Sequence, residues 1–182
     1  MRRFGLLLLL LTLPSLSWAQ KVALDTTLGT IVIQLNAQAA PKTVANFLEY
    51  VKSGHYDNTV FHRVIGNFMI QAGGYTADLN EKPTRAPIAL ESQNGLKNER
   101  GAVSMARRGD PNSATAQFFF NVVDNPRLDF PSPDGHGYAV FGKVVEGMDV
   151  VDKIRAVPTG ASGSHQSVPT TPVVIKSARI LR

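Results

Sequence analysis

The sequence predicts a mainly β domain, and three observations carry this prediction. Short runs rich in β-branched and aromatic residues recur along the chain, as strands require. Segments with glycine, proline, asparagine or aspartate, which favour turns, separate these runs. Only two segments place apolar residues at helical spacing. Eight or so short strands with two helices are typical of a single closed β-barrel with the helices packed over its ends.

The N-terminal segment is expected to be removed before the domain works. Arg2 and Arg3 precede an apolar run over residues 4–13, and small residues lead up to Ala19. This order is typical of a secretory signal peptide. A retained membrane anchor is the alternative, but the run has about half the roughly 20 residues that a membrane helix needs. We expect cleavage after Ala19, which leaves residues 20–182 as one domain without a membrane segment.

The first elements of that domain are a β-hairpin and a helix. Residues 22–26 and 30–35 read as strands, and Gly29 in the short gap between them favours a hairpin. Pro41 is expected to open a helix, because the first turn does not use its missing N–H. Gly54 is the expected stop. One face of this helix carries apolar residues at helical spacing: Val44, Phe47, Leu48 and Val51.

The rest of the chain alternates short strands with turns and contains one further helix. The expected strands cover residues 60–65, 68–71, 88–90, 102–106, 117–123, 138–145 and 173–181. Residues 148–155 carry apolar side chains at helical spacing. The glycine- and serine-rich residues 159–167 are expected to form a surface loop. No internal repeat and no linker divides the chain, so a single domain is expected.

Composition excludes several classes of protein. The chain has 19 basic and 14 acidic residues, and loss of Arg2 and Arg3 lowers its formal charge from +5 to +3. Arg107 and Arg108 form the only basic pair after the signal, whereas nucleic-acid binding calls for a concentrated basic face. The chain has no cysteine, which excludes disulfides and thiolate chemistry.

Polar side chains interrupt three of the apolar strands. They are Arg63, Gln71 and Gln117. Alternation along a strand places Phe61, Arg63 and Ile65 on one face, and Gln117 shares a face with Phe119. A guanidinium and two amides among aromatic side chains describe a shallow apolar groove with fixed hydrogen-bond donors, as ligand sites have. The alternative is an edge-strand arginine whose head lies in water, beside two ordinary surface amides.

Five motifs, taken in order, closely resemble the cyclophilin family. They are Phe61-His62-Arg63-Val64-Ile65, Phe68-Met69-Ile70-Gln71-Ala72-Gly73, Ser104-Met105-Ala106-Arg107, Gln117-Phe118-Phe119 and Val140-Phe141-Gly142-Lys143-Val144. The resemblance extends over residues 22–181 and is strongest to the short, exported bacterial branch. It implies a closed eight-stranded antiparallel β-barrel capped by two α-helices, with the site on its outer face. It also implies peptidyl-prolyl cis–trans isomerase activity.

The resemblance assigns roles to individual residues. Arg63 would stabilise the twisted amide, and Gln71 would orient Arg63 or bind the substrate backbone. Phe68, Met69, Phe119 and Leu128 would form the slot for the proline ring. The full set of substrate-binding candidates is Phe61, Phe68, Met69, Ala106, Arg107, Gln117, Phe119, Leu128 and Tyr138. No covalent bond is broken in this reaction, so no nucleophile, metal or cofactor is expected.

The chain departs from many family members at two positions of the site. Arg127 stands where many eukaryotic members have a tryptophan that supports cyclosporin binding, so weak cyclosporin binding is expected. Tyr138 aligns with a pocket histidine, and its hydroxyl can still donate a hydrogen bond to a substrate carbonyl. The loop over residues 129–137 is longer than in short relatives.

Other functions find little support in the sequence. The four histidines lack metal-site spacing, and Gly135 and Gly137 precede a strand rather than the helix of a dinucleotide loop. A binding or chaperone module of the same fold without turnover is the main alternative, and the presence of Arg63 favours catalysis. A secreted factor acting on host proteins is a more remote one. We expect a monomeric periplasmic isomerase acting on proline-containing exported polypeptides.

Overall fold

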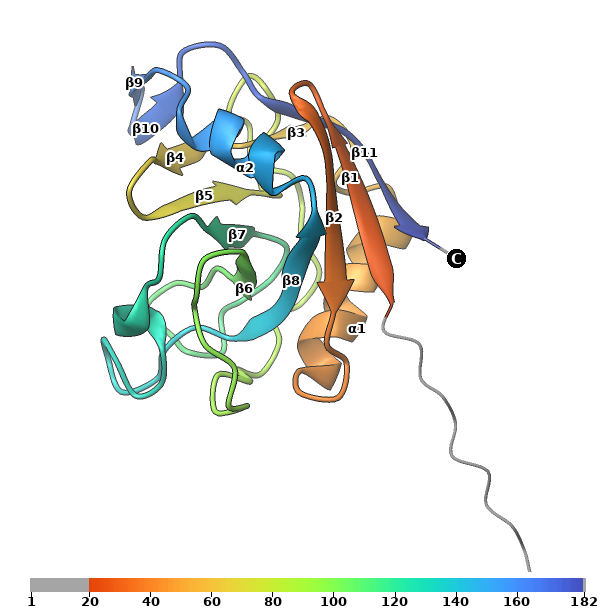
Figure 1. The fold of residues 1–182 in the computed structure, drawn as a ribbon, viewed down its shortest axis with the longest axis vertical. Coiled ribbons are helices and arrows are strands. Elements are labelled where there is room, and N and C mark those ends of the chain that lie inside the picture. The colour runs from red at the N-terminus through yellow and green to blue at the C-terminus, as the bar shows by residue number, and fades with distance from the viewer. Residues whose placement is uncertain (1–19, 182) are drawn as a thin grey trace, which may run out of the picture.

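A computed structural model describes residues 20–181 as one strongly curled antiparallel sheet with two α-helices (Figure 1). The sheet has nine strands in the order β3-β11-β1-β2-β8-β6-β7-β5-β4. Its strands are β1 (Lys21–Thr26), β2 (Gly29–Leu35), β3 (Thr59–Val60), β4 (Arg63–Ile65), β5 (Met69–Ala72), β6 (Ala102–Met105), β7 (Phe118–Asn121), β8 (Val140–Glu146) and β11 (Val174–Leu181). The mainly β prediction is confirmed.

The curl of the sheet encloses the main hydrophobic core. The hairpin of β1 and β2 was predicted, and it lies between β11 and β8 in the sheet. Side chains such as Leu24, Ile31 and Ile33 are fully buried on its inner side. Phenylalanines complete this core: Phe118 and Phe141 lie 5.3 and 5.0 Å from the ring of Phe47, measured between centroids.

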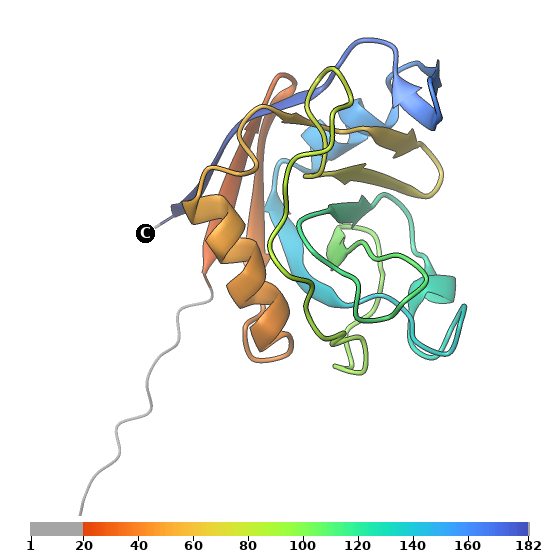
Figure 2. The same ribbon diagram turned by 180° about the vertical axis from the view of Figure 1, so that it is seen from behind.

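Two helices cover different parts of the sheet. Helix α1 (Pro41–Lys52) begins at the predicted proline and packs against β11, as seen from behind in Figure 2. The carboxylate of Glu91 accepts hydrogen bonds from the backbone N–H groups of Lys42 and Thr43, which satisfies donors at the N-terminus of this helix. Helix α2 (Met148–Arg155) packs against β2, β4 and β5. Within residues 20–181, neither helix is long and apolar enough to cross a membrane.

The expected strand over residues 60–65 is in fact two strands. Val60 of β3 pairs with β11, whereas Arg63 of β4 pairs with β5, and residues 61–62 between them belong to neither ladder. The chain changes partner at this point, so simple alternation fails across it. Phe61 is therefore fully buried in the main core, while Arg63 is exposed. The prediction that these two side chains share a face is wrong.

Two further expectations differ from the structure. In residues 88–90, only Ile88 forms a bridge, with Ala114, so this run is not a strand of the sheet. The glycine- and serine-rich segment expected as a loop forms an exposed hairpin of β9 (Thr159–Ser162) and β10 (His165–Pro169). This hairpin packs against β4, and that tertiary contact compensates for its weak strand propensity.

Gly147, between β8 and α2, provides a test of the packing at this junction. Its φ of +82° disfavours any other residue, and a Cβ there would also collide with the carbonyl oxygen of Thr30. A left-handed backbone alone costs a residue other than glycine about 1–2 kcal/mol. We predict that Gly147→Ala lowers the free energy of unfolding by more than this amount, because of the added clash with Thr30. Urea unfolding followed by circular dichroism measures this loss.

Gly163→Ala is the matched control, because Gly163 has a φ of +58° and no atom within 4 Å of its Cβ position. Its loss should stay within the backbone cost of about 1–2 kcal/mol. Equal losses in the two variants would show that the contact with Thr30 contributes nothing.

Candidate active site

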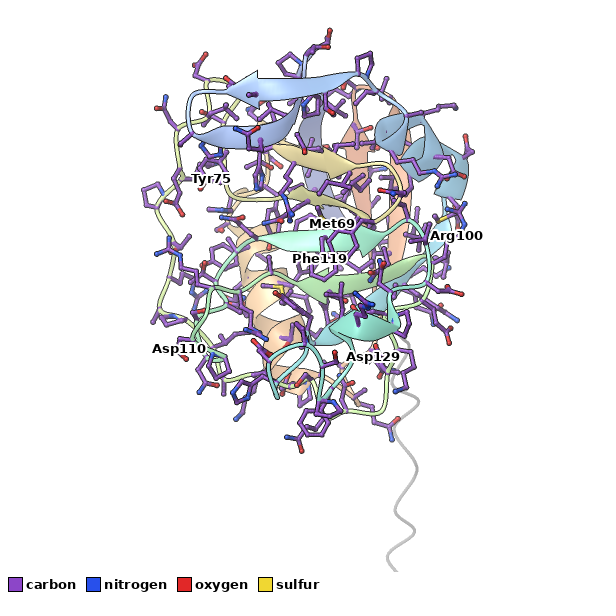
Figure 3. The ribbon with its side chains drawn as sticks, turned by 90° about the vertical axis from the view of Figure 1, so that its left-hand side faces the viewer. Met69, Tyr75, Arg100, Asp110, Phe119 and Asp129 are labelled. Carbon is purple, nitrogen blue, oxygen red and sulfur yellow. The ribbon has the colours of Figure 1, made fainter. Side chains whose placement is uncertain are left out.

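Strands β4, β5 and β7 bring the central candidates onto one face of the sheet. The pairing register sets Arg63 opposite Gln71 and Gln71 opposite Phe119. Met69 follows on the same face of β5, because side chains two residues apart point the same way. Figure 3 shows Met69 and Phe119 close together on neighbouring strands at the centre of this face.

Three polar side chains form a row along one side of this face. The Nη1 of Arg63 donates a long hydrogen bond of 3.5 Å to Oε1 of Gln71. The Nε2 of Gln71 donates a shorter bond of 2.8 Å to Oε1 of Gln117. Gly74 leaves room for Gln117, because a Cβ there would lie 2.6 Å from the Cγ of that side chain. Gln71 is thus fixed from behind, while the guanidinium of Arg63 is exposed and lightly held.

A second apolar cluster, separate from the main core, lies beside this polar row. Its buried members are Met69, Phe119 and Leu128, and its partly buried members are Ile65, Phe68, Ala106 and Tyr138. We call this cluster the apolar slot. The ring of Tyr138 stands edge-on to Phe119, with centroids 5.7 Å apart and planes at 79°. The backbone N–H of Tyr138 donates to the carbonyl of Leu128 at 2.8 Å. The neighbouring strands β5 and β7, the turn at Leu128 and the segment at Tyr138 thus form one apolar surface.

The structure brings together nine of the eleven predicted site residues. Arg63, Gln71 and Gln117 form the polar row, and the predicted slot residues are all in the second cluster. Phe61 is a correction: its ring lies in the main core, 6.2 Å from that of Phe120, and cannot touch a ligand on the outer face. The side chain of Arg107 is only 2% exposed, which is compatible with the role that the resemblance implies for Arg107, a contact with the peptide through its backbone. Ile65 was absent from the candidates, although alternation from Arg63 indicates it.

A buried polar network supports the slot from behind, and the sequence analysis missed it. The Nδ2 of Asn125 donates at 2.8 Å to both the carbonyl of Phe68 and Oδ1 of Asn121. Asn121 in turn donates to Oδ1 of Asn98, which also accepts from the Ser104 hydroxyl at 2.7 Å. The members of the network are Asn98, Ser104, Asn121, Asn125 and Asp129.

This network reaches both walls of the slot. It holds the carbonyl of Phe68 on one side, and Oδ1 of Asp129, next to Leu128, accepts from the backbone and side chain of Asn98 on the other. Buried polar groups are costly unless paired, so these bonds fix the backbone at both places. Asn121 at the end of an aromatic strand is the one sequence signal that could have revealed it.

His62 lies beneath the polar row on the buried side. Its ring packs at a tilt against that of Tyr75, with centroids 4.6 Å apart and planes at 56°, and its side chain is buried. Within residues 20–181, its Nδ1 has no hydrogen-bond partner. Burial, and then the charge of His165, lower the pKa of His62 to about 4. His62 is therefore neutral at pH 7 and adds no charge behind Arg63.

The described part of the chain holds no group of three or more histidine, aspartate or glutamate side chains placed to bind a metal ion. The site thus consists of one exposed guanidinium, two linked amides and an apolar slot. Such a site can bind a small apolar ring and direct one hydrogen-bond donor at a group beside it.

The sequence matches a known family over almost all of the described domain. Residues 21–180 match the model of the family described as "Cyclophilin type peptidyl-prolyl cis-trans isomerase/CLD". "Peptidyl-prolyl cis-trans isomerase cyp18" of Streptomyces antibioticus is 60% identical over 88% of this chain and 98% of its own. "Peptidyl-prolyl cis-trans isomerase B" of Escherichia coli strain K12 is 54% identical over 87% of this chain and 98% of its own.

Solved structures agree with this result. A cyclophilin-type peptidyl-prolyl cis-trans isomerase of Cryptosporidium parvum aligns with a TM-score of 0.74 and 29% identity. The alignment covers 91% of this chain and 99% of that one. A second structure of the same protein, solved in the presence of the dipeptide Ala-Pro, aligns with a TM-score of 0.73.

The chain belongs to the cyclophilin-type peptidyl-prolyl cis–trans isomerase family. It is an isomerase of Xaa-Pro peptide bonds, and proline-containing peptides are the ligands of this family. The activity that the motifs implied is thereby confirmed, and so is a mainly β, cyclophilin-like fold with two helices and a strongly curled antiparallel sheet.

The buried His62 gives the protein a predictable response to acid. The folded state holds His62 neutral, so its contribution to stability is complete above pH 6.5 and is lost as pH falls from 6.5 towards 4. We predict that His62→Phe, which keeps a ring against Tyr75, removes about 2 kcal/mol of the acid-induced loss between pH 7 and pH 4.5. Urea unfolding at the two pH values measures this difference.

Carboxylates titrate alike in both proteins, so the comparison isolates the histidine. If wild type and His62→Phe lose the same stability between the two pH values, His62 does not remain neutral through burial.

Proposed function

We propose that Arg63 is the catalytic residue and that it acts on the nitrogen of the Xaa-Pro amide. Rotation about this bond has a barrier of about 18–20 kcal/mol, because the C–N bond has partial double-bond character. Twisting removes the conjugation and turns the nitrogen into a better hydrogen-bond acceptor. A guanidinium that donates to the nitrogen binds the twisted amide more tightly than the planar one, and that difference lowers the barrier. The observation that carries the proposal is the exposed Arg63 head beside the apolar slot.

The neighbouring residues would hold the substrate around that donor. The proline ring would lie in the apolar slot against Met69, Phe119 and Leu128, which are already buried together. Gln71, held by Gln117, would keep Arg63 in place and present its amide to the substrate backbone. The backbone of Ala106 and Arg107 would bind the peptide beyond the isomerising bond. Because Gln117 already holds Gln71 in place, this part of the polar row needs little rearrangement when a substrate binds.

Tyr138 and Arg127, the two positions at which the chain departs from many family members, are expected to affect different ligands. No side-chain hydrogen bond within residues 20–181 engages the hydroxyl of Tyr138, so it is free to donate to a substrate carbonyl. Arg127, in the short 3-10 helix η1 (Pro126–Leu128), is exposed and offers no aromatic ring to a large apolar ligand. We propose efficient turnover of short proline peptides together with weak cyclosporin binding.

We further propose that the enzyme works outside the cytoplasm, in the periplasm, as a monomer that assists the folding of exported polypeptides. The charged, apolar and small-residue order of residues 1–19 supports export, although these residues lie outside the described part of the chain. The absence of cysteine suits any redox environment. Uncatalysed prolyl isomerisation takes roughly 10–100 s, which is slow enough to limit folding.

We also propose that the curled sheet is a closed barrel. The strands at the two ends of the sheet order, β3 and β4, are separated by only residues 61–62 of the chain. This short segment would join the two ends, as the family resemblance implies.

The catalytic role of Arg63 is tested by cis-to-trans exchange of a proline tetrapeptide. We predict that Arg63→Ala lowers kcat/KM by roughly 10²-fold or more, the usual effect of removing one transition-state donor. Arg85→Ala is the control, because Arg85 pairs with Glu49 on the surface away from the slot, and it should keep wild-type activity.

Three outcomes are informative here. Loss in Arg63→Ala alone, with unchanged circular dichroism, supports the proposed role. Wild-type activity in Arg63→Ala overturns it. If wild type exchanges the peptide no faster than buffer but still binds it, the protein is a binding module instead.

Export is tested with the full chain carrying a C-terminal tag in a Gram-negative host. We predict recovery in the periplasmic fraction with Gln20 as the first residue. A variant lacking residues 4–13 should remain in the cytoplasm at full length. Recovery of the intact full chain in the membrane fraction would contradict the proposal and indicate a retained anchor.

A further inference from the structure

Arg107 has a side chain that the proposed mechanism does not use. It follows Ala106, a residue of the apolar slot, yet its own side chain is only 2% exposed. An arginine so deeply buried needs partners for its donors, because an unpaired buried charge is costly. Its partners indicate what the side chain does.

The guanidinium is held almost completely by the loop over residues 129–137. Its Nη2 donates to both carboxylate oxygens of Asp134, at 2.8 and 2.7 Å. Its Nε donates to the carbonyl of Gly137 at 3.0 Å, and Nη1 donates to that of Arg108 at 3.0 Å. Three of its five N–H donors thus have partners, because the two oxygens of Asp134 share one hydrogen of Nη2. With its side chain only 2% exposed, the guanidinium has no free edge to offer a substrate directly.

The same guanidinium lies over the ring of Tyr138, with its Cζ 4.6 Å from the ring centroid. Cation–π attraction is strongest where water is excluded, as it is around this arginine. Tyr138 faces the slot from this position, since its ring contacts Phe119 and its backbone bonds to Leu128. A single side chain thus contacts the loop at Asp134 and Gly137 and the ring that forms the wall of the slot.

We propose that Arg107 is a positioning residue for isomerisation, which fixes the ring of Tyr138 and the loop behind it against the apolar slot. The proposal rests on the proposed function, in which Tyr138 meets the substrate. Arg107 contacts the ring of Tyr138 on the side away from the slot and does not touch the peptide. Lysine cannot reproduce this arrangement, because only the planar guanidinium pairs with the carboxylate, donates to two backbone carbonyls and stacks on the ring at the same time.

Asp134 links the guanidinium of Arg107 to the backbone of the loop. Its Oδ1 also accepts the backbone N–H of His136 at 3.1 Å, which shapes the turn before Gly137. The hydrogen bond from Arg107 is the largest cause that lowers the pKa of Asp134. The carboxylate is therefore ionised at neutral pH, and the pair persists under working conditions.

The test compares Arg107→Lys and Arg107→Met with the same changes at Arg100. Arg100 is a matched control because it also pairs with a carboxylate, that of Asp152, at 2.7 and 3.1 Å, and donates to a backbone carbonyl, that of Val122. It lies at the edge of the molecule, away from Phe119 (Figure 3). We expect kcat/KM for a proline tetrapeptide to fall about tenfold in both Arg107 variants, within the range of a desolvated cation–π contact. The Arg100 variants should keep wild-type activity.

A double-mutant cycle separates positioning from general destabilisation. If Arg107 acts through the ring of Tyr138, Arg107→Lys should have no further effect on kcat/KM in a Tyr138→Ala background. Full additivity of the two losses overturns the proposal. Unchanged kcat/KM in the single Arg107 variants, or an equal loss in the Arg100 variants, overturns it as well.

A measurement without turnover keeps the result independent of the proposed function. The chain has only four tyrosines, so ring signals in a tyrosine-labelled sample are easily resolved by NMR. The signals of Tyr138 should shift or broaden in Arg107→Lys and remain unchanged in Arg100→Lys. If the wild type lacks isomerase activity, the proposed function is wrong. If the Tyr138 signals are the same in Arg107→Lys as in the wild type, only the positioning role of Arg107 is wrong.

Discussion

The pairing of β5 between β4 and β7 is the constraint on which the site depends. Its register sets Arg63, Gln71 and Phe119 in one row across three strands. A shift of a single residue in either ladder would turn these side chains to the other face. The main core on the inner side prevents such a shift, because Ile70 and Phe120 are fully buried there and pair with each other. Burial on one face of the sheet thereby fixes the active site on the other.

Catalysis of rotation demands little chemistry but accurate placement. An enzyme that breaks no bond gains rate only by binding the twisted amide better than the planar one. The molecule provides this placement with hydrogen bonds rather than with flexible surface contacts. Gln117 holds Gln71 from one side, and the asparagine network holds the carbonyl of Phe68 and the turn beside Leu128 from the other. The apolar slot is therefore enclosed by backbone that is fixed at several points.

Sequence reasoning recovered what local pattern controls. The hairpin of β1 and β2, the start of α1 at Pro41, and the helix over residues 148–155 all follow from turn residues and periodicity. It failed at residues 61–62, because a change of strand partner depends on distant parts of the chain. Phe61 was misplaced for that reason. The hairpin of β9 and β10 was missed because its glycine and serine residues have weak strand propensity.

In the site, too, local motifs predicted some residues, whereas contacts between distant segments could not be predicted. Motif order brought Arg63, Gln71 and the slot residues together correctly in one region. The buried network and the partners of the Arg107 side chain could not be foreseen. They join loops far apart in the chain: Arg107 to Asp134, and Asn98 to Asp129. Hydrogen bonds between loops leave almost no periodic signal in a sequence.

The most direct test of the account is a crystal structure of the protein with a bound Ala-Pro-containing tetrapeptide. The account predicts the proline ring against Met69, Phe119 and Leu128, with the guanidinium of Arg63 within hydrogen-bonding distance of the proline nitrogen. A peptide bound elsewhere, or an Arg63 that points away from that nitrogen with the ring in the slot, would contradict it.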